Sequence, residues 1–333
     1  MKDAAPIVLV AGATRGAGRG IAVAFGEAGA VVHCTGRSTR GGAPNHERPE
    51  TIEETAELVE EAGGRGVAHV VDHTDETAVR ELCERIRRDH GRIDVLVNDI
   101  WGGDALTEWG KSFHELDVAQ GFRLLERAVH THVITSRHAG PLVLEAPRGL
   151  IVEVTDGAFR GYRMNLFYDL AKSSVMRLAY GMSVELENTP HTALAITPGF
   201  LRSEAMLDHF GVTEANWREA IGQDPHFAAS ETPLFVGRVL AALASDPDVG
   251  GYAGQTLTSW ELARKYGVRD VDGRQPHWEE HLDRAVEEIL AKESPTDDEL
   301  QLLAYRGPQL DFDPARADQR RRLRAVLARC SEK

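Results

Sequence analysis

Apolar and polar positions follow two different spacings along the first 260 residues of the chain. Short runs rich in β-branched and aliphatic residues predict seven strands, at residues 7–11, 30–34, 67–71, 94–98, 150–155, 193–197 and 256–258. Longer segments between them carry apolar residues at helical spacing, as at residues 19–28, 49–62 and 76–88. Buried strands that alternate with helices predict an α/β fold, with a single Rossmann-type doubly wound parallel sheet covered by helices on both faces.

The pattern changes at about residue 259, after which no strand is predicted. Residues 278–292 and 315–328 predict two amphipathic helices, the second strongly basic, and the acidic residues 297–299 are typical of a helix start. We therefore expect residues 1–258 to form one domain that holds both cofactor and substrate, and residues 259–333 to form a mostly helical C-terminal extension. The pattern leaves open whether this extension covers the active site, a neighbouring subunit or neither.

Composition narrows the function classes. Of 333 residues, 42% are hydrophobic, which suffices for a large core, and the formal charge is 38 − 52 = −14. This acidity argues against a nucleic-acid partner or an anionic membrane surface, but not against a small phosphate site with its own local cations. The three cysteines are far apart, and the histidine and carboxylate clusters lack metal-ligand spacing, so we expect no metal. With no signal sequence and no apolar stretch of about 18 residues, we expect a cytoplasmic protein without membrane insertion.

A glycine-rich loop follows the first strand. Gly12, Gly16 and Gly18 lie between that strand and a helix, where small residues let backbone amides and a helix N-terminus approach a pyrophosphate. The alternative is a plain tight turn. The second strand ends at Arg37, 19 residues after Gly18, where sites selective for NAD usually carry an acid and an arginine accommodates a 2′-phosphate. Because Arg15 lies inside the loop, we expect NADP(H) to be preferred over NAD(H), unless both arginines are solvated surface residues.

One tyrosine has a lysine four residues later. Tyr168 and Lys172 would share a helix face, where the ammonium would lower the pKa of the phenol. Tyr168 could then give a proton to a carbonyl oxygen or take one from an alcohol. The alternative is an exposed helix pair without a catalytic role.

These motifs occur in a familiar order. The series Gly12-x3-Gly16-x-Gly18, Val97-Asn98, Tyr168-x3-Lys172 and Pro198-Gly199 resembles the short-chain dehydrogenase/reductase family over residues 7–257. Residues 262–274 are similar to the branch of that family typified by dehydrogenase/reductase family member one. The resemblance implies an NADP(H)-dependent oxidoreductase that interconverts a carbonyl and an alcohol, with Tyr168 as general acid/base. It also implies roles for further residues: Thr155 in place of the family's catalytic serine, Lys172 on the nicotinamide ribose, Asp72 on adenine, Asn98 on the adenosine side, and Pro198, Gly199 and Ser203 beside nicotinamide.

The chain also departs from the family pattern. Thr155 replaces serine but keeps a hydroxyl donor, Asp99 and Trp101 are unusual after the fourth strand, and Ala128 occupies the place of the family's relay asparagine, with His130 and His132 nearby. Two alternatives therefore stay open: a dinucleotide-binding regulatory protein with weak or lost catalysis, and a non-redox lyase or epimerase on the same fold.

The remaining expectations concern substrate and assembly. Apolar residues flank the catalytic positions and predict a small, hydrophobic substrate: Trp101, Trp109, Phe159, Tyr162, Met164, Phe167 and Phe200. Residues 203–232 are expected to form a substrate lid, and Arg202 and Glu204 to be loop charges. Helices near residues 118–140 and 168–187 permit a homodimer or homotetramer, as is usual in the family.

Overall fold

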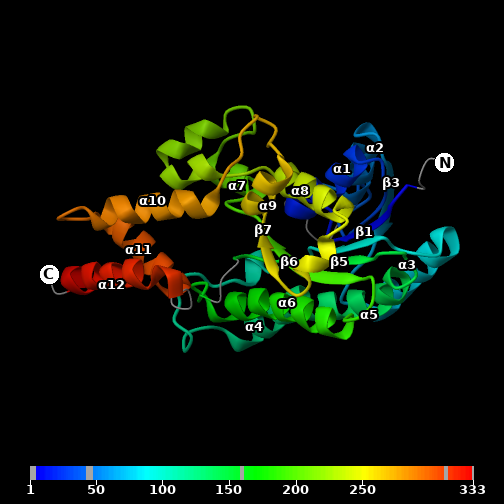
Figure 1. Cartoon of the computed structure of the whole chain (residues 1–333), viewed down its shortest axis with the longest axis horizontal. Helices are drawn as coiled ribbons and strands as arrows, with labels where there is room; N and C mark the ends of the chain where they lie inside the picture. The colour runs from blue at the N-terminus through cyan, green and yellow to red at the C-terminus, as the bar shows by residue number, and fades with distance from the viewer. Residues whose placement is uncertain (1–4, 43–47, 158–160, 311–313, 332–333) are drawn as a thin grey trace.

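The computed structural model describes residues 5–42, 48–157, 161–310 and 314–331 (Figure 1). Its sheet is parallel throughout, with the strand order β3-β2-β1-β4-β5-β6-β7. The predicted doubly wound sheet is confirmed, and each strand lies within two residues of its predicted ends: β1 Ile7–Ala11, β2 Val31–Gly36, β3 Arg65–Val70, β4 Val95–Asn98, β5 Leu150–Val154, β6 Thr192–Thr197 and β7 Thr256–Thr258. The strand order reverses between β1 and β4, and in such sheets ligands bind beyond the carboxyl ends of the strands at that point.

Helices cover both faces of the sheet. Helices α1, α2 and α8 lie on one face and α3, α5 and α6 on the other (Figure 1). The helices are α1 Gly16–Glu27, α2 Ile52–Glu61, α3 Glu76–His90, α4 Val118–Leu125, α5 Thr131–Val143, α6 Leu166–Glu185, α7 Glu204–Phe210, α8 Pro233–Ser245, α9 Ser259–Tyr266, α10 Trp278–Leu290, α11 Asp297–Gln309 and α12 Ala317–Ser331. Short 3-10 helices are η1 Asp104–Leu106, η3 Trp217–Gly222, η4 Pro225–Ala229, η5 Val249–Tyr252 and η6 Pro314–Arg316, and η2 Glu126–His130 is a π-helical turn that joins α4 to α5.

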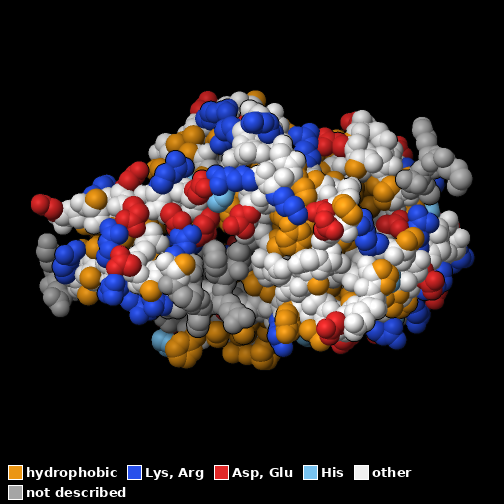
Figure 2. All heavy atoms as spheres, in the orientation of Figure 1, with side chains coloured by type: hydrophobic (Ala, Val, Ile, Leu, Met, Phe, Trp, Pro, Cys, Tyr) orange, Lys and Arg blue, Asp and Glu red, His pale blue; other side chains and the backbone are white. Residues whose placement is uncertain are grey.

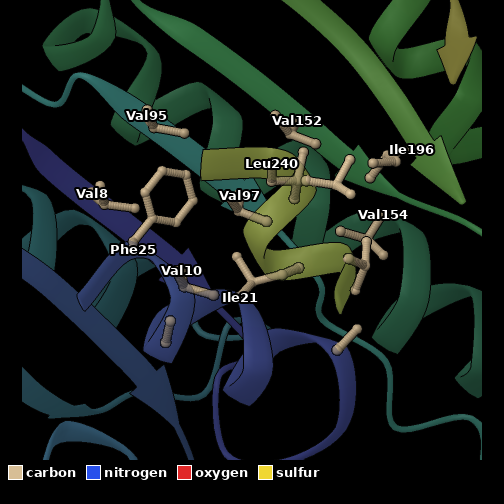
Figure 3. Packing of buried hydrophobic residues seen from close by; sticks show 14 of the residues in the cluster. Val8, Val10, Ile21, Phe25, Val95, Val97, Val152, Val154, Ile196 and Leu240 are labelled. Carbon is tan, nitrogen blue, oxygen red and sulfur yellow. The ribbon is translucent and has the colours of Figure 1, made fainter. Parts of the chain in front are cut away.

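Strand β1 is buried on both faces, because every residue in it is apolar. Val8 and Val10 pack with Ile21 of α1 on one face (Figure 3), while Ile7 and Leu9 belong to the hydrophobic cluster on the other. Successive side chains of a strand point to opposite faces, so a continuous apolar run fills two cores at once. The glycine loop thus starts from a strand held on both sides.

Helices α1 and α8 touch backbone to backbone. A Cβ atom on Gly20 would lie 2.1 Å from the carbonyl carbon of Pro233, and one on Gly237 would lie 2.5 Å from the carbonyl oxygen of Gly20. A side chain at either glycine would push the helices apart. This contact fixes α1, and with it the loop that α1 begins.

The C-terminal helices lie at the end of the molecule opposite the N-terminus (Figure 1). Helices α10, α11 and α12 share a small core that includes Val286, Leu303 and Leu323. Helix α10 also reaches the main body, where the rings of Trp278 and Phe200 have centroids 5.6 Å apart. Across the described ranges, no helix has both the length and the apolar character needed to cross a membrane.

Candidate active site

The glycine loop is tightly folded against the loop that follows β4. Gly12 has a φ of +91°, and a Cβ atom on it would lie 2.4 Å from the backbone oxygen of Asp99. A Cβ atom on Gly18 would lie 2.2 Å from the backbone oxygen of Gly12. Neither position can take a side chain without displacing backbone. The loop therefore keeps the open backbone surface that a pyrophosphate site requires.

The first N–H of α1 already binds an anionic oxygen. The backbone amide of Gly16 donates to Oε2 of Glu204, the first residue of α7, over 2.8 Å. Helix N-termini favour negative charge, so this contact indicates what kind of group the loop accepts. The expectation that Glu204 is only a loop charge was wrong, because its carboxylate joins the lid to the glycine loop.

The two predicted arginines have acidic neighbours: Arg37 follows β2, and Arg15 lies in the glycine loop just before α1. Arg37 Nη1 is 3.5 Å from Asp72 Oδ2, so the structure brings these two candidates together. Arg15 Nη2 donates to Ser38 Oγ over 3.3 Å, and its Nε is 3.2 Å from Glu50 Oε2. Sequence reasoning missed Glu50 because it comes after the loop that follows β2.

A third guanidinium reaches the same acid. Arg48 Nη2 lies 2.8 Å from Glu50 Oε1, and Arg48 Nη1 lies 3.0 Å from Asp208 Oδ2 of α7. Glu50 is largely buried, and it is shared by two guanidiniums. The region beside the glycine loop therefore pairs three guanidiniums, of Arg15, Arg37 and Arg48, with the carboxylates of Glu50, Asp72 and Asp208.

Tyr168 is half-buried in the first turn of α6, which Asn165 caps by accepting from two backbone amides. Its Oη donates to Oδ2 of Asp156 over 2.8 Å. The rings of Trp101 and Trp109 lie against it, with centroids 5.3 Å and 5.1 Å away. Burial and the Asp156 carboxylate raise the pKa of Tyr168 well above its usual value near 10.

Lys172 lies one turn further along α6 and is half-buried. Its Nζ is 4.3 Å from the ring centroid of Trp101 and 5.6 Å from that of Tyr168. Burial lowers the pKa of Lys172, although the carboxylates of Asp156 and Asp99 oppose this change. The expectation that Lys172 lowers the pKa of Tyr168 is not met here, because burial and Asp156 outweigh the ammonium.

Thr155 lies at the carboxyl end of β5, as predicted. Its Oγ1 donates to the backbone oxygen of Lys172 over 2.9 Å. The sequence suggested that this hydroxyl would face a substrate carbonyl. In the structure it instead ties the end of β5 to helix α6, since the backbone of α6 passes directly above it.

A buried polar network supports the loop after β4. Asn98 Nδ2 donates to Glu153 Oε1 over 2.8 Å, and Glu153 Oε2 lies 2.5 Å from His132 Nδ1. His132 Nε2 lies 2.9 Å from the backbone oxygen of Ile100. Burial acts to lower the pKa of His132, but the Glu153 carboxylate and the Ile100 backbone oxygen together raise it above its usual value. Sequence reasoning missed Glu153, although a lone acid inside the apolar run of β5 is a usable signal.

Ala128 lies in the π-helical turn, at the place expected for a relay asparagine. It is buried in an apolar cluster with Leu124 and Ala171, so its own side chain offers no polar group there. The nearby His132 is engaged with Glu153 and Ile100.

Asp99 is a buried acid between the glycine loop and Lys172. It accepts a hydrogen bond from the Gly18 amide. Burial raises the pKa of Asp99 from 3.8 to about 7, although Lys172, Gly18 and His132 act to lower it. Asp99 therefore connects the glycine loop electrostatically to Lys172.

Replacing Asp99 by asparagine should stabilise the cofactor-free protein above pH 7. The folded wild type keeps the Asp99 proton up to about pH 7, whereas the unfolded chain releases it near pH 3.8, so wild-type stability falls as the pH rises between these values. Asp99→Asn carries no such penalty. At pH 8 its free energy of unfolding should exceed that of the wild type by on the order of 1 kcal/mol or more, and the gap should close toward pH 4.

Urea denaturation at pH 4, 6 and 8 measures this gap. The matched control is Asp89→Asn, which removes an exposed acid of α3 and should leave a constant difference from the wild type. A gap for Asp99→Asn that does not change with pH would contradict the assignment.

The segment after β6 is held by another buried acid. The Gly199 amide donates to Glu231 Oε2 over 2.9 Å, and a Cβ atom on Gly199 would lie 3.0 Å from Cβ of Trp278 in α10. Burial raises the pKa of Glu231 to about 8. Ser203 caps α7, its Oγ accepting from the Met206 amide over 3.4 Å. The predicted nicotinamide flank, Pro198–Gly199, is thus fixed from both the lid and the C-terminal extension.

Arg202 is a buried residue, so its assignment as a loop charge was wrong. Its Nη2 lies 2.8 Å from Glu214 Oε1 and 3.6 Å from Asp270 Oδ2. The guanidinium also lies over the ring of Trp217, 4.1 Å from the centroid. Since Asp270 belongs to residues 262–274, this cluster joins the lid to the segment that follows the sheet.

A hollow with a volume of about 640 Å³ is lined by Gly110, Lys111, Ser112, Phe113, Tyr162, Met164 and Leu166. Leu166 begins α6, two residues before Tyr168, but Tyr168 itself is not part of this lining. The other aromatic candidates have separate places: Phe167 packs on Phe122 of α4, Phe200 packs on Phe227 of the lid, and Phe159 lies outside the described residues.

The chain is similar to known short-chain dehydrogenases. A family model described as short chain dehydrogenase matches residues 6–210. The human protein named Dehydrogenase/reductase SDR family member 1 is 32% identical over 278 residues, which cover 80% of this chain and 84% of that protein. The mouse protein of the same name is 33% identical over 273 residues, with the same coverage. A solved short-chain dehydrogenase from Mycobacterium thermoresistibile aligns with a TM-score of 0.67 at 22% identity, over 82% of this chain and 91% of that one.

Proposed function

The chain belongs to the short-chain dehydrogenase/reductase family and is an oxidoreductase acting on CH-OH/C=O groups with NAD(P), and from this premise we propose that it prefers NADP(H). We also propose that Tyr168 is the general acid/base and that the substrate is a small, hydrophobic carbonyl or alcohol. One observation carries the proposal. Helix α6 holds Tyr168 and Lys172 against Trp101, at the same edge of the sheet as the glycine loop. Asp99 links the two parts, because it binds the Gly18 amide and interacts with the Lys172 ammonium.

The residues around the glycine loop fit a dinucleotide. Gly12, Gly16 and Gly18 would hold the pyrophosphate, which would replace the Glu204 carboxylate on the Gly16 amide. Arg15 and Arg37 would bind the 2′-phosphate. The remaining contacts follow the family pattern: Asp72 and Asn98 on the adenosine side, Lys172 on the nicotinamide ribose, and Pro198, Gly199 and Ser203 beside nicotinamide. When bound, NADP(H) supplies or accepts the hydride.

The proton chemistry then falls to the protein. Because the pKa of Tyr168 lies well above 10, its Oη stays protonated at neutral pH and can donate to a carbonyl oxygen that is being reduced. Lys172 contributes a half-buried positive charge next to Trp101. Thr155 fixes the position of α6, because its hydroxyl donates to the backbone oxygen of Lys172. To polarise the substrate carbonyl, the Thr155 hydroxyl would have to exchange this hydrogen bond for one to the substrate.

The cofactor preference is testable at Arg37. The wild type should show a higher kcat/KM with NADPH than with NADH, and Arg37→Leu should lower the ratio by about 10-fold to 100-fold, since a hydrogen bond between charged groups contributes about 1.5–3 kcal/mol. The matched control is Arg40→Leu in the same loop, because Arg40 is exposed and pairs with Glu57. A wild type that prefers NADH would contradict the proposed 2′-phosphate site.

A substrate panel tests the reaction itself. Oxidation of NADPH in the presence of aldehydes, ketones and quinones should reveal carbonyl reduction, strongest for apolar compounds that suit the hollow of about 640 Å³. Tight NADPH binding without reduction of any compound would favour the dinucleotide-binding regulator. Conversion of a compound without net cofactor oxidation would favour the lyase or epimerase.

We also propose a homodimer or homotetramer built from α4 and α6, with residues 1–258 as the catalytic domain and residues 259–333 as the extension. Figure 2 shows apolar side chains gathered along the edge of the molecule where α4 lies. Exposed apolar residues on these helices include Val118, Phe122, Leu170 and Val184. Exposed apolar patches of this kind favour association.

A further inference from the structure

We propose that Asp156 relays protons between solvent and Tyr168, and that Arg163 and Tyr305 hold it in place; this inference rests on the proposed function and deepens it. Tyr305 belongs to α11, so the C-terminal extension contributes a residue to the environment of the catalytic tyrosine.

Asp156 is in contact with both the buried hydroxyl and the surface. Its Oδ2 accepts the Tyr168 Oη–H over 2.8 Å, while 41% of the Asp156 side chain is exposed to solvent. Tyr168 itself is half-buried, with the rings of Trp101 and Trp109 against it. A carboxylate that touches a half-buried acid/base and also meets water is well placed to exchange protons with each.

The side of α6 that faces away from Asp156 is a poor route for proton transfer to Tyr168. Ala171, the residue before Lys172, packs with Ala128 and Leu124 in an apolar cluster. The Lys172 Nζ lies over the indole of Trp101. Among the described residues, the charged and titratable groups that face Asp156 are Tyr168 and Lys172 of α6, Arg163 of the preceding loop and Tyr305 of α11.

The proposed step balances without any further reactant. During reduction, the carbonyl carbon gains the hydride that the cofactor supplies, the Tyr168 Oη–H bond breaks, and a new O–H bond forms on the substrate oxygen. The Asp156 carboxylate then takes a proton from a solvent hydronium ion, and the resulting carboxyl group passes this proton to the Tyr168 phenolate, so that both side chains return to their starting states. In alcohol oxidation each transfer runs in reverse.

Two groups hold the relay carboxylate from the other side. Arg163 Nη2 lies 3.4 Å from Asp156 Oδ1, and Arg163 Nη1 donates to Tyr305 Oη over 3.0 Å. A Cβ atom on Gly157 would lie 1.4 Å from Arg163 Nη2, so the guanidinium uses the space that this glycine leaves. A Cβ atom on Gly161 would lie 2.0 Å from Cα of Gln309, so α11 is packed directly on this loop.

The relay is tested by removing the carboxylate while keeping its shape. Asp156→Asn should lower kcat for reduction by about 100-fold with little change in KM, and should change the pH dependence of kcat. In Asp156→Ala, added acetate or formate should restore part of the lost kcat, because a free carboxylate can take over the transfer. NADPH binding, followed by fluorescence, should equal that of the wild type in both variants. Glu185→Gln, which removes an exposed acid at the end of the same helix, is the control and should leave kcat unchanged.

A second readout needs no cofactor. Absorbance titration of tyrosinate in the cofactor-free protein should show one tyrosine that ionises at lower pH in Asp156→Asn than in the wild type, because the carboxylate raises the pKa of Tyr168. The same transition should be missing in Tyr168→Phe, which identifies it.

The positioning role of Tyr305 is measured by a double-mutant cycle. Tyr305→Phe should lower kcat by about 3-fold to 10-fold in the wild-type background and have no effect in the Asp156→Asn background, because its influence passes through the carboxylate. Equal losses in both backgrounds would assign Tyr305 a purely structural role.

The outcomes separate this inference from the proposed function. If Tyr168→Phe abolishes reduction while Asp156→Asn keeps wild-type kcat and pH dependence, the relay is overturned and the proposed function stands. If the wild type reduces nothing, or Tyr168→Phe stays active, both are overturned.

Discussion

Replacing Tyr168 by phenylalanine should reduce kcat for carbonyl reduction by about 100-fold to 10,000-fold, the range that a positioned general acid contributes. Phenylalanine keeps the ring contacts with Trp101 and Trp109 and removes only the hydroxyl that donates to Asp156. Cofactor affinity and thermal stability should therefore change little. Single-turnover oxidation of NADPH with an apolar aldehyde or ketone measures the loss in the chemical step.

The matched control for this variant is Tyr180→Phe. Tyr180 lies on the same helix three turns further on, is partly exposed and packs against the guanidinium of Arg177. Its hydroxyl should make no difference to kcat. Should both variants keep wild-type turnover, Tyr168 is not the acid/base and the catalytic assignment fails.

The second large effect concerns stability. Arg202→Ala should lower the free energy of unfolding by about 3–5 kcal/mol, the usual cost of removing one partner from a buried ion pair. The change leaves Asp270 buried with its hydrogen bonds from Thr232 and the Val271 amide but without the Arg202 guanidinium, and it opens a gap beside the Trp217 ring. The urea midpoint, followed by tryptophan fluorescence, should fall clearly.

Arg218→Ala provides the comparison, because Arg218 also lies over the ring of Trp217, 4.7 Å from its centroid. Its side chain is 60% exposed, and its partner Asp272 is 3.4 Å away, so its removal should cost about 1 kcal/mol or less. Equal midpoints for the two variants would show that burial of Arg202 adds nothing to stability.

The fold could be predicted well because its signals are local. A strand buried on both faces is mostly apolar, so β1 and the centre of β6 are visible as continuous apolar runs. The glycine loop could also be predicted, because its glycines are needed for close backbone packing. Gly18 packs against the backbone of Gly12 in the same loop, and Gly12 packs against the backbone of Asp99 at the end of the adjacent strand.

Side-chain partners could not be predicted, because they come from distant parts of the chain. Tyr168 was found, but its hydrogen bond to Asp156 and its raised pKa depend on how the loop after β5 folds back. Glu50, Glu231 and Asp270 are ordinary acids in the sequence, and only tertiary structure shows which of them meet Arg15, Gly199 and Arg202.

The C-terminal extension illustrates the same limit. Amphipathic spacing predicts its helices, but no pattern in the sequence connects Tyr305 with Arg163, and the contact is made from α11, well past the end of the sheet. The sequence left open whether the extension covers the active site, a neighbouring subunit or neither. The contact between Tyr305 and Arg163 supports the first of these.

The backbone contact between Gly20 and Pro233 also constrains how the chain can be made. The two residues are 233 − 20 = 213 positions apart, so at about 5–20 residues per second a ribosome needs on the order of 10–40 s to deliver the second after the first. During that interval the face of α1 that α8 will cover has no partner from its own chain, and the first β-α-β segment cannot complete its core. Assembly of this domain must therefore wait until nearly the whole of it has been synthesised, which makes the nascent N-terminal half a natural client for chaperones.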